Sequence, residues 1–261
     1  MRAAGDRPEA APVGGFDPAD GRRGLEDHLE GWFEQIETDF RATTLNRLVL
    51  GLTPSGRVLD IGCGSGALSA ELLRGGRDVV SQDLSDRMLE LCRTHLARRH
   101  LDSSGVRAGG VDDIPERDFF DAAIALDVIE HIDDDVGALR RLRDALKPTG
   151  TLIVSVPAIS RLYGPKDVEV GHYRRYDKAT LLDALNRAGF ESEMCRYWNL
   201  IGVPAVWLSV RRGERLDEGF RYSRSPGKRA LNAALRGWLR RVEGPIAPPI
   251  GLTLLATATP R

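Results

Sequence analysis

The sequence predicts an α/β fold: a doubly wound, Rossmann-like sheet of seven mainly parallel strands with helices on both faces. Short apolar segments alternate with longer amphipathic segments from about residue 55 to the end of the chain. A glycine-rich turn, residues 62–66, follows the first apolar segment and precedes a helical pattern. Because parallel strands end at one edge of such a sheet, we expect a ligand site at that edge, beside this turn.

The order of strands and helices follows from their boundary signals. Ser85 caps the helix after the second strand, and Asp177 caps the helix before the sixth. Pro148 and Gly150 stop the helix whose apolar face leads into the fifth strand. The expected strands are residues 57–61, 78–82, 106–109, 119–126, 151–156, 190–196 and 252–258.

The domain organisation has three parts. Residues 1–24 lack apolar periodicity and are expected to form a disordered tail, whereas residues 25–54 predict N-terminal helices that form either core or a lid. Residues 55–261 form the main domain, with a basic helical insert at 211–243 before the last strand. The insert places an apolar stripe on a cationic helix, which suits a membrane surface, an acidic substrate, a cover over the site or a solvated helix on its own domain.

Composition excludes several classes of protein. The net charge of −1 disfavours a general nucleic-acid binder. Three cysteines without a CxxC pair favour reduced thiols and a cytoplasmic protein. We find neither an apolar run able to span a bilayer nor the apolar core of a signal peptide, so we expect a soluble protein.

The glycine turn alone does not choose between two cofactor classes, since its spacing also satisfies the dinucleotide fingerprint. Asp60, just before the turn, decides: its carboxylate would repel a pyrophosphate and attract the cationic S-adenosylmethionine. Asp83 ends the second strand, where an acidic residue holds ribose hydroxyls of either cofactor; the alternative is a simple strand-end turn residue.

Residues 59–66, Asp83 and residues 125–132 resemble three motifs of class I S-adenosylmethionine-dependent methyltransferases, and the likeness extends over about residues 45–258. The resemblance implies a seven-stranded sheet whose last strand is antiparallel. It also implies Asp60 near the methionine end, the glycines under the methionyl chain, Asp83 on the ribose and the Asp127 segment over the methionine.

One stretch departs from that family. Gly110 stands where many relatives have the Asp that faces the adenine amino group. We expect the Val111 backbone to pair with the ring and Asp112 to take over the amino contact. The predicted cofactor-binding residues are Asp60, Gly62, Cys63, Gly64, Gly66, Asp83, Leu84, Met88, Val111, Asp112 and Asp127.

Two segments carry candidate catalytic and substrate groups. An acidic cluster from Asp127 to Asp135 is interpreted as a helix cap rather than a metal site, because no second ligand run with metal-like spacing appears. His131, within it, is either a base, a substrate contact or a helix-cap histidine. Residues 171–176 resemble a block found in a subset of small-molecule and sugar-pathway methyltransferases. His172 is the first candidate for the base and His131 the second; the predicted substrate residues are Tyr163, Tyr173, Arg174 and Trp32.

Together these patterns predict methyl transfer from S-adenosylmethionine to the oxygen or nitrogen of a small acceptor of a natural-product or sugar-like class. The alternatives are a methyltransferase of a lipid-linked intermediate at the membrane surface, an NAD-dependent oxidoreductase that Asp60 disfavours, and a non-catalytic protein that binds S-adenosylmethionine.

Overall fold

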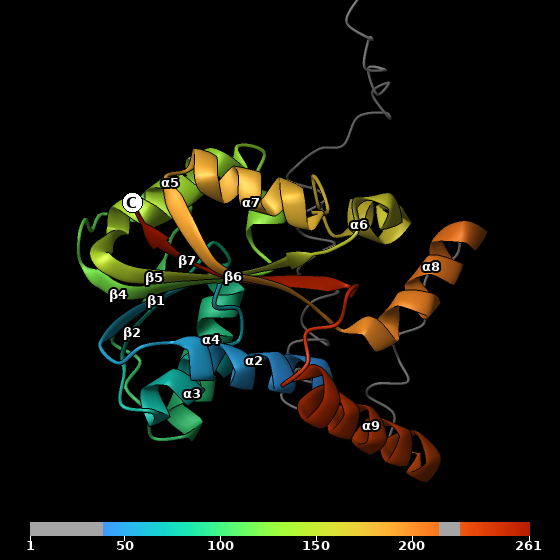
Figure 1. Cartoon of the computed structure of the whole chain (residues 1–261). Helices are drawn as coiled ribbons and strands as arrows, with labels where there is room; N and C mark the ends of the chain where they lie inside the picture. The colour runs from blue at the N-terminus through green and yellow to red at the C-terminus, as the bar shows by residue number, and fades with distance from the viewer. Residues whose placement is uncertain (1–38, 214–224) are drawn as a thin grey trace, which may run out of the picture.

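The structure, a computed structural model, describes residues 39–213 and 225–261. Its centre is a seven-stranded sheet in the order β3-β2-β1-β4-β5-β7-β6 (Figure 1). The first five strands run parallel to one another, and β7 lies antiparallel between β5 and β6, as expected. The strands are β1 Arg57–Ile61, β2 Asp78–Asp83, β3 Val106–Ala108, β4 Phe120–Leu126, β5 Leu146–Pro157, β6 Phe190–Trp198 and β7 Thr253–Pro260.

Helices cover both faces of the sheet, which confirms the doubly wound architecture. In Figure 1, α5 and α7 lie above the sheet, and α2, α3 and α9 lie below it. Each face has its own apolar core: α5 and α7 pack on one side, and α2 and α3 on the other. The helices are α2 Phe40–Leu52, α3 Ala67–Arg74, α4 Asp86–Arg98, α5 Asp135–Ala145, α6 Pro165–Glu169, α7 Lys178–Arg187, α8 Val203–Arg212 and α9 Pro226–Trp238.

The fifth strand begins earlier than the sequence predicted. Leu146 was assigned to the preceding helix, but it has extended backbone angles and pairs with Phe120 of β4. A residue before proline avoids the helical conformation, so Lys147 cannot continue the helix into Pro148. Two further helices, α6 and α8, were not predicted. Helix α6 has only five residues, too few to show an apolar period, whereas Val203, Val206, Trp207 and Val210 of α8 recur at helical spacing although none of them is buried.

The basic insert is described in part. Helix α9 packs against the core beside α2 through Leu235, and Leu239 follows it in a buried π-helical turn. Leu231 and Trp238 stay 49% and 42% exposed, so the predicted apolar stripe is only partly covered. Residues 1–38, which include Trp32, and residues 214–224 lie outside the described residues.

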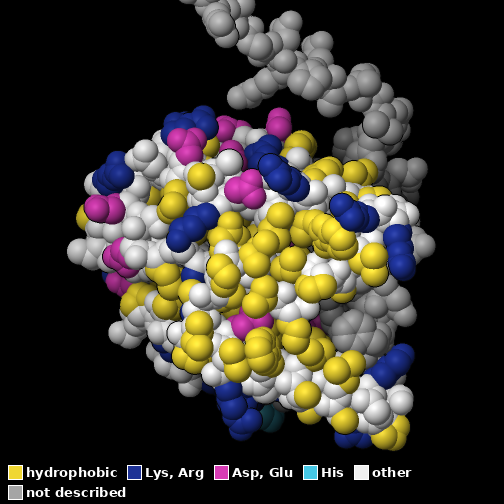
Figure 2. Space-filling view, turned by 45° about the vertical axis from the view of Figure 1, so that its right-hand side comes forward, with side chains coloured by type: hydrophobic (Ala, Val, Ile, Leu, Met, Phe, Trp, Pro, Cys, Tyr) yellow, Lys and Arg dark blue, Asp and Glu magenta, His cyan; other side chains and the backbone are white. Residues whose placement is uncertain are grey.

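Apolar side chains gather on the face that carries α8 and α9, with lysine and arginine side chains around them (Figure 2). Helix α8 has no buried residue, and Trp207 and Leu208 are 45% and 41% exposed. No helix within the described part of the chain is long and apolar enough to cross a membrane. The exposed large apolar residues of α6, α8, α9 and the segments beside them are Tyr163, Val168, Ile201, Trp207, Leu208, Leu231, Trp238, Ile246 and Ile250.

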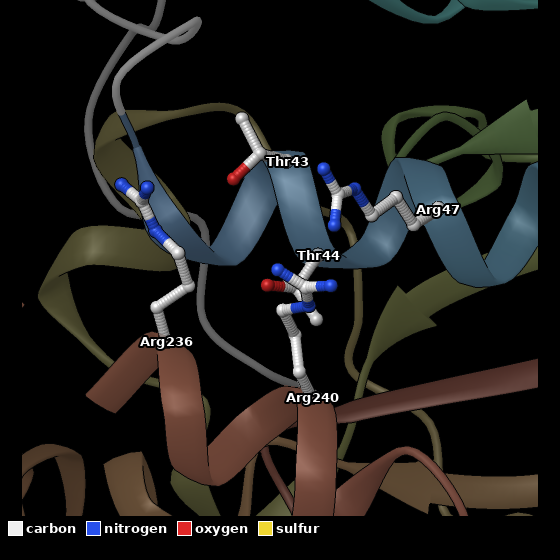
Figure 3. Close-up of a pocket in the computed structure, with 5 residues that line it drawn as sticks. All are labelled: Thr43, Thr44, Arg47, Arg236 and Arg240. Atoms are coloured by element: carbon white, nitrogen blue, oxygen red, sulfur yellow. The ribbon is translucent and has the colours of Figure 1, made fainter. Parts of the chain in front are cut away.

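A pocket of about 150 Å³ opens between α2 and α9 (Figure 3). Its polar lining carries three guanidinium groups, and it includes none of the residues predicted for the cofactor or for catalysis. The residues that line it are Thr43, Thr44, Arg47, Arg236 and Arg240. This pocket is therefore separate from the site at the carboxyl edge of the sheet.

Candidate active site

The glycine turn joins the carboxyl end of β1 to the start of α3. Gly62, Gly64 and Gly66 all have positive φ, between 51° and 76°, which L side chains rarely adopt. The structure leaves little room for a side chain either: a Cβ at Gly62 would lie 2.5 Å from Val128, and one at Gly66 would lie 2.5 Å from the Cys92 sulfur. The turn therefore presents bare backbone at the edge of the sheet.

Asp83 fastens this turn to the end of β2. One carboxylate oxygen accepts the Gly64 N–H at 2.9 Å, and the other accepts the Ser85 N–H at 2.9 Å. Burial raises the pKa of Asp83, although these backbone hydrogen bonds oppose the rise. The turn role that was the alternative for Asp83 is thus real, and the same carboxylate lies at the edge where a ribose contact was predicted.

Asp60 lies behind the turn rather than on its surface. It is 3% exposed, and its carboxylate accepts the Ser69 hydroxyl at 2.6 Å. Ser81 on β2 in turn donates to the Ser69 oxygen at 2.9 Å. Burial raises the pKa of Asp60 to about 7, against the effect of the Ser69 hydrogen bond. Its charge state is therefore sensitive to any cation that binds beside the turn.

Asp112 lies on the surface, next to Gly110 and Val111. Its side chain is 87% exposed, and its nearest ion-pair partner is Arg141 of α5 at 3.7 Å. Its contact with the adenine amino group stays a prediction. Gly110 faces Leu84, since a Cβ on this glycine would lie 3.2 Å from a Leu84 methyl group. Leu84 itself is 74% exposed, while Val111 is buried in the main core.

The remaining predicted cofactor residues differ in accessibility. Cys63 and Met88 are 8% and 4% exposed, so both side chains lie inside the fold rather than on its surface. Asp127 follows β4 in a left-handed conformation with φ of 53° and is tied to β5, because its N–H donates to the Ser155 carbonyl and its carboxylate accepts the Ser155 hydroxyl at 3.1 Å. It therefore stands at the carboxyl edge, as predicted.

The two candidate bases lie against one another beyond β4 and β5. The rings of His131 and His172 meet edge to face, with centroids 4.6 Å apart. Partial burial of the His131 ring and the neighbouring His172 lower the pKa of His131 to about 4, so it is neutral at pH 7. His172 is the less exposed of the two.

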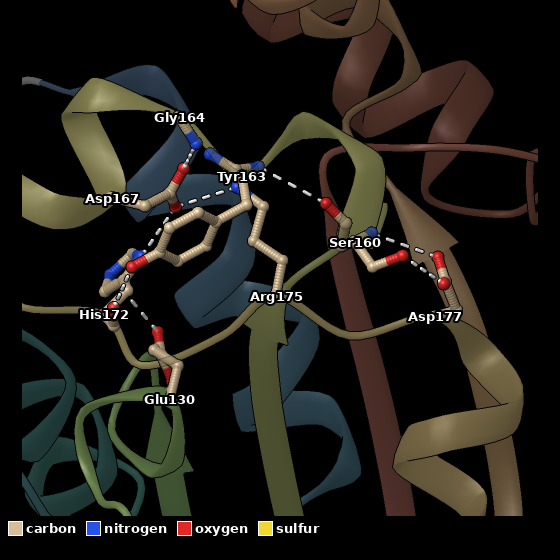
Figure 4. A network of polar contacts seen from close by, with 9 residues as sticks. Glu130, Ser160, Tyr163, Gly164, Asp167, His172, Arg175 and Asp177 are labelled. Atoms are coloured by element: carbon tan, nitrogen blue, oxygen red, sulfur yellow. Dashed lines mark hydrogen bonds and ion pairs between the residues drawn. The ribbon is translucent and has the colours of Figure 1, made fainter. Parts of the chain in front are cut away.

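A buried carboxylate fixes the orientation of His172 (Figure 4). The Nδ1 atom of His172 lies 2.8 Å from Oδ1 of Asp167, which is 1% exposed. Burial opposes ionisation, but hydrogen bonds from His172 and Arg175 hold the pKa of Asp167 below its ordinary value. An ionised carboxylate only accepts, so Nδ1 carries the proton and the Nε2 lone pair of neutral His172 stays available.

Glu130 closes the inner side of this cluster. Its side chain is fully buried, and neither carboxylate oxygen accepts a hydrogen bond within the described residues. One oxygen lies 3.9 Å from Nε2 of His172. Burial, with a smaller contribution from Asp127, raises the pKa of Glu130 well above its ordinary value.

Three of the predicted substrate residues fall within the described residues and lie near His172 in the structure or in the sequence. The Tyr163 hydroxyl donates to the His172 carbonyl at 2.7 Å, and Tyr163 is 40% exposed. Tyr173 is 57% exposed. Arg174 is tied down by an ion pair with Asp135 at 3.1 Å and a hydrogen bond to the Asp133 carbonyl. Tyr163 and Tyr173 are therefore accessible to an acceptor, whereas Arg174 mainly anchors the loop.

The acidic run before α5 is a helix cap, as interpreted. Asp134 is the N-cap residue, and its carboxylate accepts the Gly137 N–H at 2.9 Å. Asp135 in the first turn also accepts the Tyr176 hydroxyl at 2.7 Å. Glu130 and His131 are not part of this cap, because they belong to a separate 3₁₀ turn, Ile129–His131.

Sequence reasoning missed Asp167 and Arg175, and it gave Glu130 no separate role. Asp167 reaches His172 from α6, which the sequence did not predict. Arg175 donates to the same carboxylate oxygen at 2.8 Å and therefore belongs to the same network. The one signal that points to Asp167 is its position five residues before His172, which by itself identifies no contact.

Comparison with known proteins agrees with the fold. Residues 59–154 match the family model described as a methyltransferase domain. A ubiquinone biosynthesis O-methyltransferase of Bradyrhizobium diazoefficiens is 38% identical over 99 residues, which span 38% of this chain and 39% of the relative. The chain thus spans well under half the length of this curated relative.

Two solved structures share the fold over nearly the whole chain. One is 1,6-didemethyltoxoflavin-N1-methyltransferase of Burkholderia thailandensis, with a TM-score of 0.59, 20% identity and coverage of 97% of this chain and 93% of that chain. The other is a possible histamine N-methyltransferase of Thermotoga maritima, with a TM-score of 0.58, 21% identity and coverage of 93% and 99%. Residues 59–154 of this chain therefore form a methyltransferase domain, and the chain has the fold of these solved methyltransferases.

Proposed function

We propose that the protein transfers the methyl group of S-adenosylmethionine to an oxygen or nitrogen of a small acceptor, of a natural-product or sugar-like class. Support comes from the glycine turn and Asp83 at the same sheet edge as His172. The relative and the two solved structures named above are methyltransferases by name, and the Burkholderia structure holds S-adenosylhomocysteine. A role in antibiotic biosynthesis and a cytoplasmic location belong to the same proposal; three free thiols support the latter.

The reaction is an in-line displacement at the methyl carbon. A lone pair of the acceptor oxygen forms the new O–C bond while the S–C bond breaks, and its electron pair stays on sulfur to give S-adenosylhomocysteine. The hydroxyl proton passes to Nε2 of His172 in this proposal. Holding the two reactants in line supplies most of the rate acceleration, and the base adds about 10²–10⁴-fold.

The proposal that His172 is the base rests on its contact with Asp167. A buried carboxylate on Nδ1 favours the tautomer whose Nε2 accepts a proton, and it stabilises the imidazolium that forms. His131 lacks such a partner in the described residues, and its lowered pKa makes it the weaker base.

Cofactor choice is tested by calorimetry with the purified protein. S-adenosylmethionine and S-adenosylhomocysteine should bind in the micromolar range, about −8 kcal/mol, and NAD should give no heat. Acceptors are then screened with cofactor labelled at the methyl group, and label should transfer to one acceptor class. Binding of NAD instead would reject the proposal, while tight S-adenosylmethionine binding with no transfer in any acceptor class would favour the non-catalytic alternative.

A second candidate is favoured by the exposed apolar residues of α8. Trp207 and Leu208 of α8 are exposed, as is Ile201 in the turn before it, and α8 contacts the 3₁₀ turn that precedes Tyr163. An acceptor with an apolar chain, presented at a membrane surface, is therefore also compatible with this surface. Liposome flotation separates the two: binding that Trp207→Ser with Leu208→Ser abolishes supports a lipid-linked acceptor. Wild-type protein that stays at the bottom of the gradient rejects it.

A further inference from the structure

Three side chains from two distant segments meet beyond the ends of β4 and β5. Glu130 and His131 come from the 3₁₀ turn after β4, and His172 comes from the loop after α6. One ligand atom from each lies within 4.8 Å of the other two. We propose that these three residues bind one divalent transition-metal ion, of which Zn²⁺ is the probe. A metal site was not expected from the sequence, because no second segment carries ligands at metal-like spacing. In the structure, His172 supplies a ligand from a second segment.

Glu130 provides the first independent support. It is fully buried, both of its oxygens lack a hydrogen-bond partner in the described residues, and one of them lies 3.9 Å from His172 Nε2. Burying a carboxylate without a partner costs several kcal/mol, so such groups in folded proteins are paired, protonated or bound to a metal. A cation held between Glu130 and the two imidazoles would satisfy these oxygens.

Asp167 provides the second support. Imidazole ligands of metals usually donate their other ring N–H to a carboxylate or carbonyl, which fixes the ring and raises the basicity of the ligating nitrogen. Asp167 accepts from Nδ1 of His172 at 2.8 Å and is itself held by Arg175 and by the Gly164 N–H. The Nε2 atom therefore faces Glu130 in a fixed orientation, as a ligand requires.

Ligand type and spacing narrow the choice of ion. Two imidazoles and one carboxylate suit zinc and its transition-metal neighbours better than Mg²⁺ or Ca²⁺, which prefer oxygen ligands. Zinc–nitrogen bonds are about 2.0–2.1 Å long, so ligand atoms on one tetrahedral ion lie about 3.4 Å apart. Ligand atoms as far as 4.8 Å apart must therefore approach by up to about 1.4 Å, and His131, the most exposed of the three ligands, is the one best placed to move.

Metal binding has a consequence for the proposed base. The Nε2 lone pair of His172 serves one partner at a time, so the ion and the proton of the acceptor compete for it. Zinc is therefore expected to inhibit methyl transfer. This consequence rests on the proposed function, whereas ion binding itself does not, because the three ligands bind zinc with or without cofactor and acceptor.

The experiment measures zinc binding to the full chain after removal of metal by a chelator. Calorimetry and elemental analysis after dialysis should give one zinc per chain, and Mg²⁺ should not compete. Glu130→Gln, which keeps size and removes charge, and His131→Ala should each weaken zinc binding at least tenfold to a hundredfold, the range seen for lost support around metal ligands. His95→Ala on α4 is the matched control and should bind zinc as wild type does.

Thermal unfolding with and without zinc separates misfolding from lost ligation. The ion should raise the melting temperature of wild type and His95→Ala but not of His131→Ala. If Glu130→Gln fails to fold, the exposed His131 decides the outcome alone. Zinc binding that is equal in His131→Ala and wild type, or stoichiometric zinc absent from wild type, would overturn the site. Neither result touches the cofactor titration that tests methyl transfer.

Discussion

Asp167 and His172 form a buried carboxylate–imidazole pair, with Oδ1 2.8 Å from Nδ1. The two residues are only five positions apart in the sequence. Their contact orients His172 toward the edge where the parallel strands end. Arg175 donates to the same oxygen and neutralises the buried charge of Asp167. Because Nδ1 of His172 faces the Asp167 carboxylate, Nε2 is the nitrogen left to accept a proton, as a general base requires.

Replacing His172 with Ala should lower turnover by about 10²–10⁴-fold, because the acceptor loses its proton acceptor. Cofactor affinity should stay nearly unchanged, since no residue of the glycine turn contacts this ring. Single-turnover assays with a chelator present check the rate, and calorimetry checks the affinity. His95→Ala is the control, and near-normal turnover of His172→Ala between pH 6 and 9 (an assay range) would reduce His172 to a scaffold residue.

Asp83→Ala should weaken S-adenosylmethionine binding by about 1.5–3 kcal/mol, or roughly tenfold to a hundredfold, through loss of the proposed ribose contact. Asp83 also accepts the Gly64 and Ser85 N–H groups, so this variant should melt at a lower temperature as well. Asp86→Ala, an exposed neighbour, is the control for charge. Unchanged affinity in Asp83→Ala, measured by calorimetry below its melting temperature, would contradict the assignment.

Gly66→Ala should destabilise the fold by two additive effects. Its φ of 76° costs an L residue about 1–2 kcal/mol, and the new methyl group, 2.5 Å from the Cys92 sulfur, adds about 1–3 kcal/mol of overpacking. Urea unfolding measures the sum, and Cys92→Ala in the same chain should restore part of it. Gly51→Ala is the control, because nothing lies within 4 Å of that position and α2 gains a better helix former. Equal unfolding free energies for Gly66→Ala and Gly51→Ala would refute the argument.

The sequence predicted the fold well because its signals are local and repeated. Residues 57–61 and the cap at Asp177 were placed correctly, since a β-branched apolar run and a capping residue act within a few positions. The mainly parallel sheet followed from crossover rules, and the antiparallel last strand followed from the family resemblance. The start of β5 was misplaced because Leu146 suits the apolar face of a helix as well as a strand.

The parts of the site that lie within sequence motifs were predictable. The parts that form only when separate loops meet were not. The glycine turn and Asp83 meet because β1 and β2 are neighbours in the sheet. Asp167 and Glu130 gain their roles only when separate loops converge on His172, and no spacing in the chain encodes that. The direction of the Asp112 side chain was likewise not readable from its proximity to Gly110, and the structure places it beside Arg141.

Asp60→Asn should change how stability depends on pH. In the folded protein burial raises the pKa of Asp60 from 3.8 to about 7, so between these values the folded state holds a proton that the unfolded state has released. The stability that this proton contributes is complete below about pH 4 and is lost as pH rises through about 7. At about 1.4 kcal/mol per pKa unit, the loss amounts to about 4 kcal/mol at most.

Urea unfolding at a series of pH values measures this loss. Other buried acids also titrate, so the informative quantity is the difference in unfolding free energy between wild type and Asp60→Asn. This difference should shift in favour of Asp60→Asn as pH rises from about 4 to 7, because only wild type loses the contribution of the Asp60 proton. Asp78→Asn, with an exposed side chain, is the matched control and should give a constant difference. Because a cation beside the turn favours the ionised carboxylate, wild type should also bind S-adenosylmethionine more tightly as pH rises through about 7, and Asp60→Asn should not. Parallel stability curves for wild type and Asp60→Asn would show that the Asp60 carboxyl does not titrate in this range.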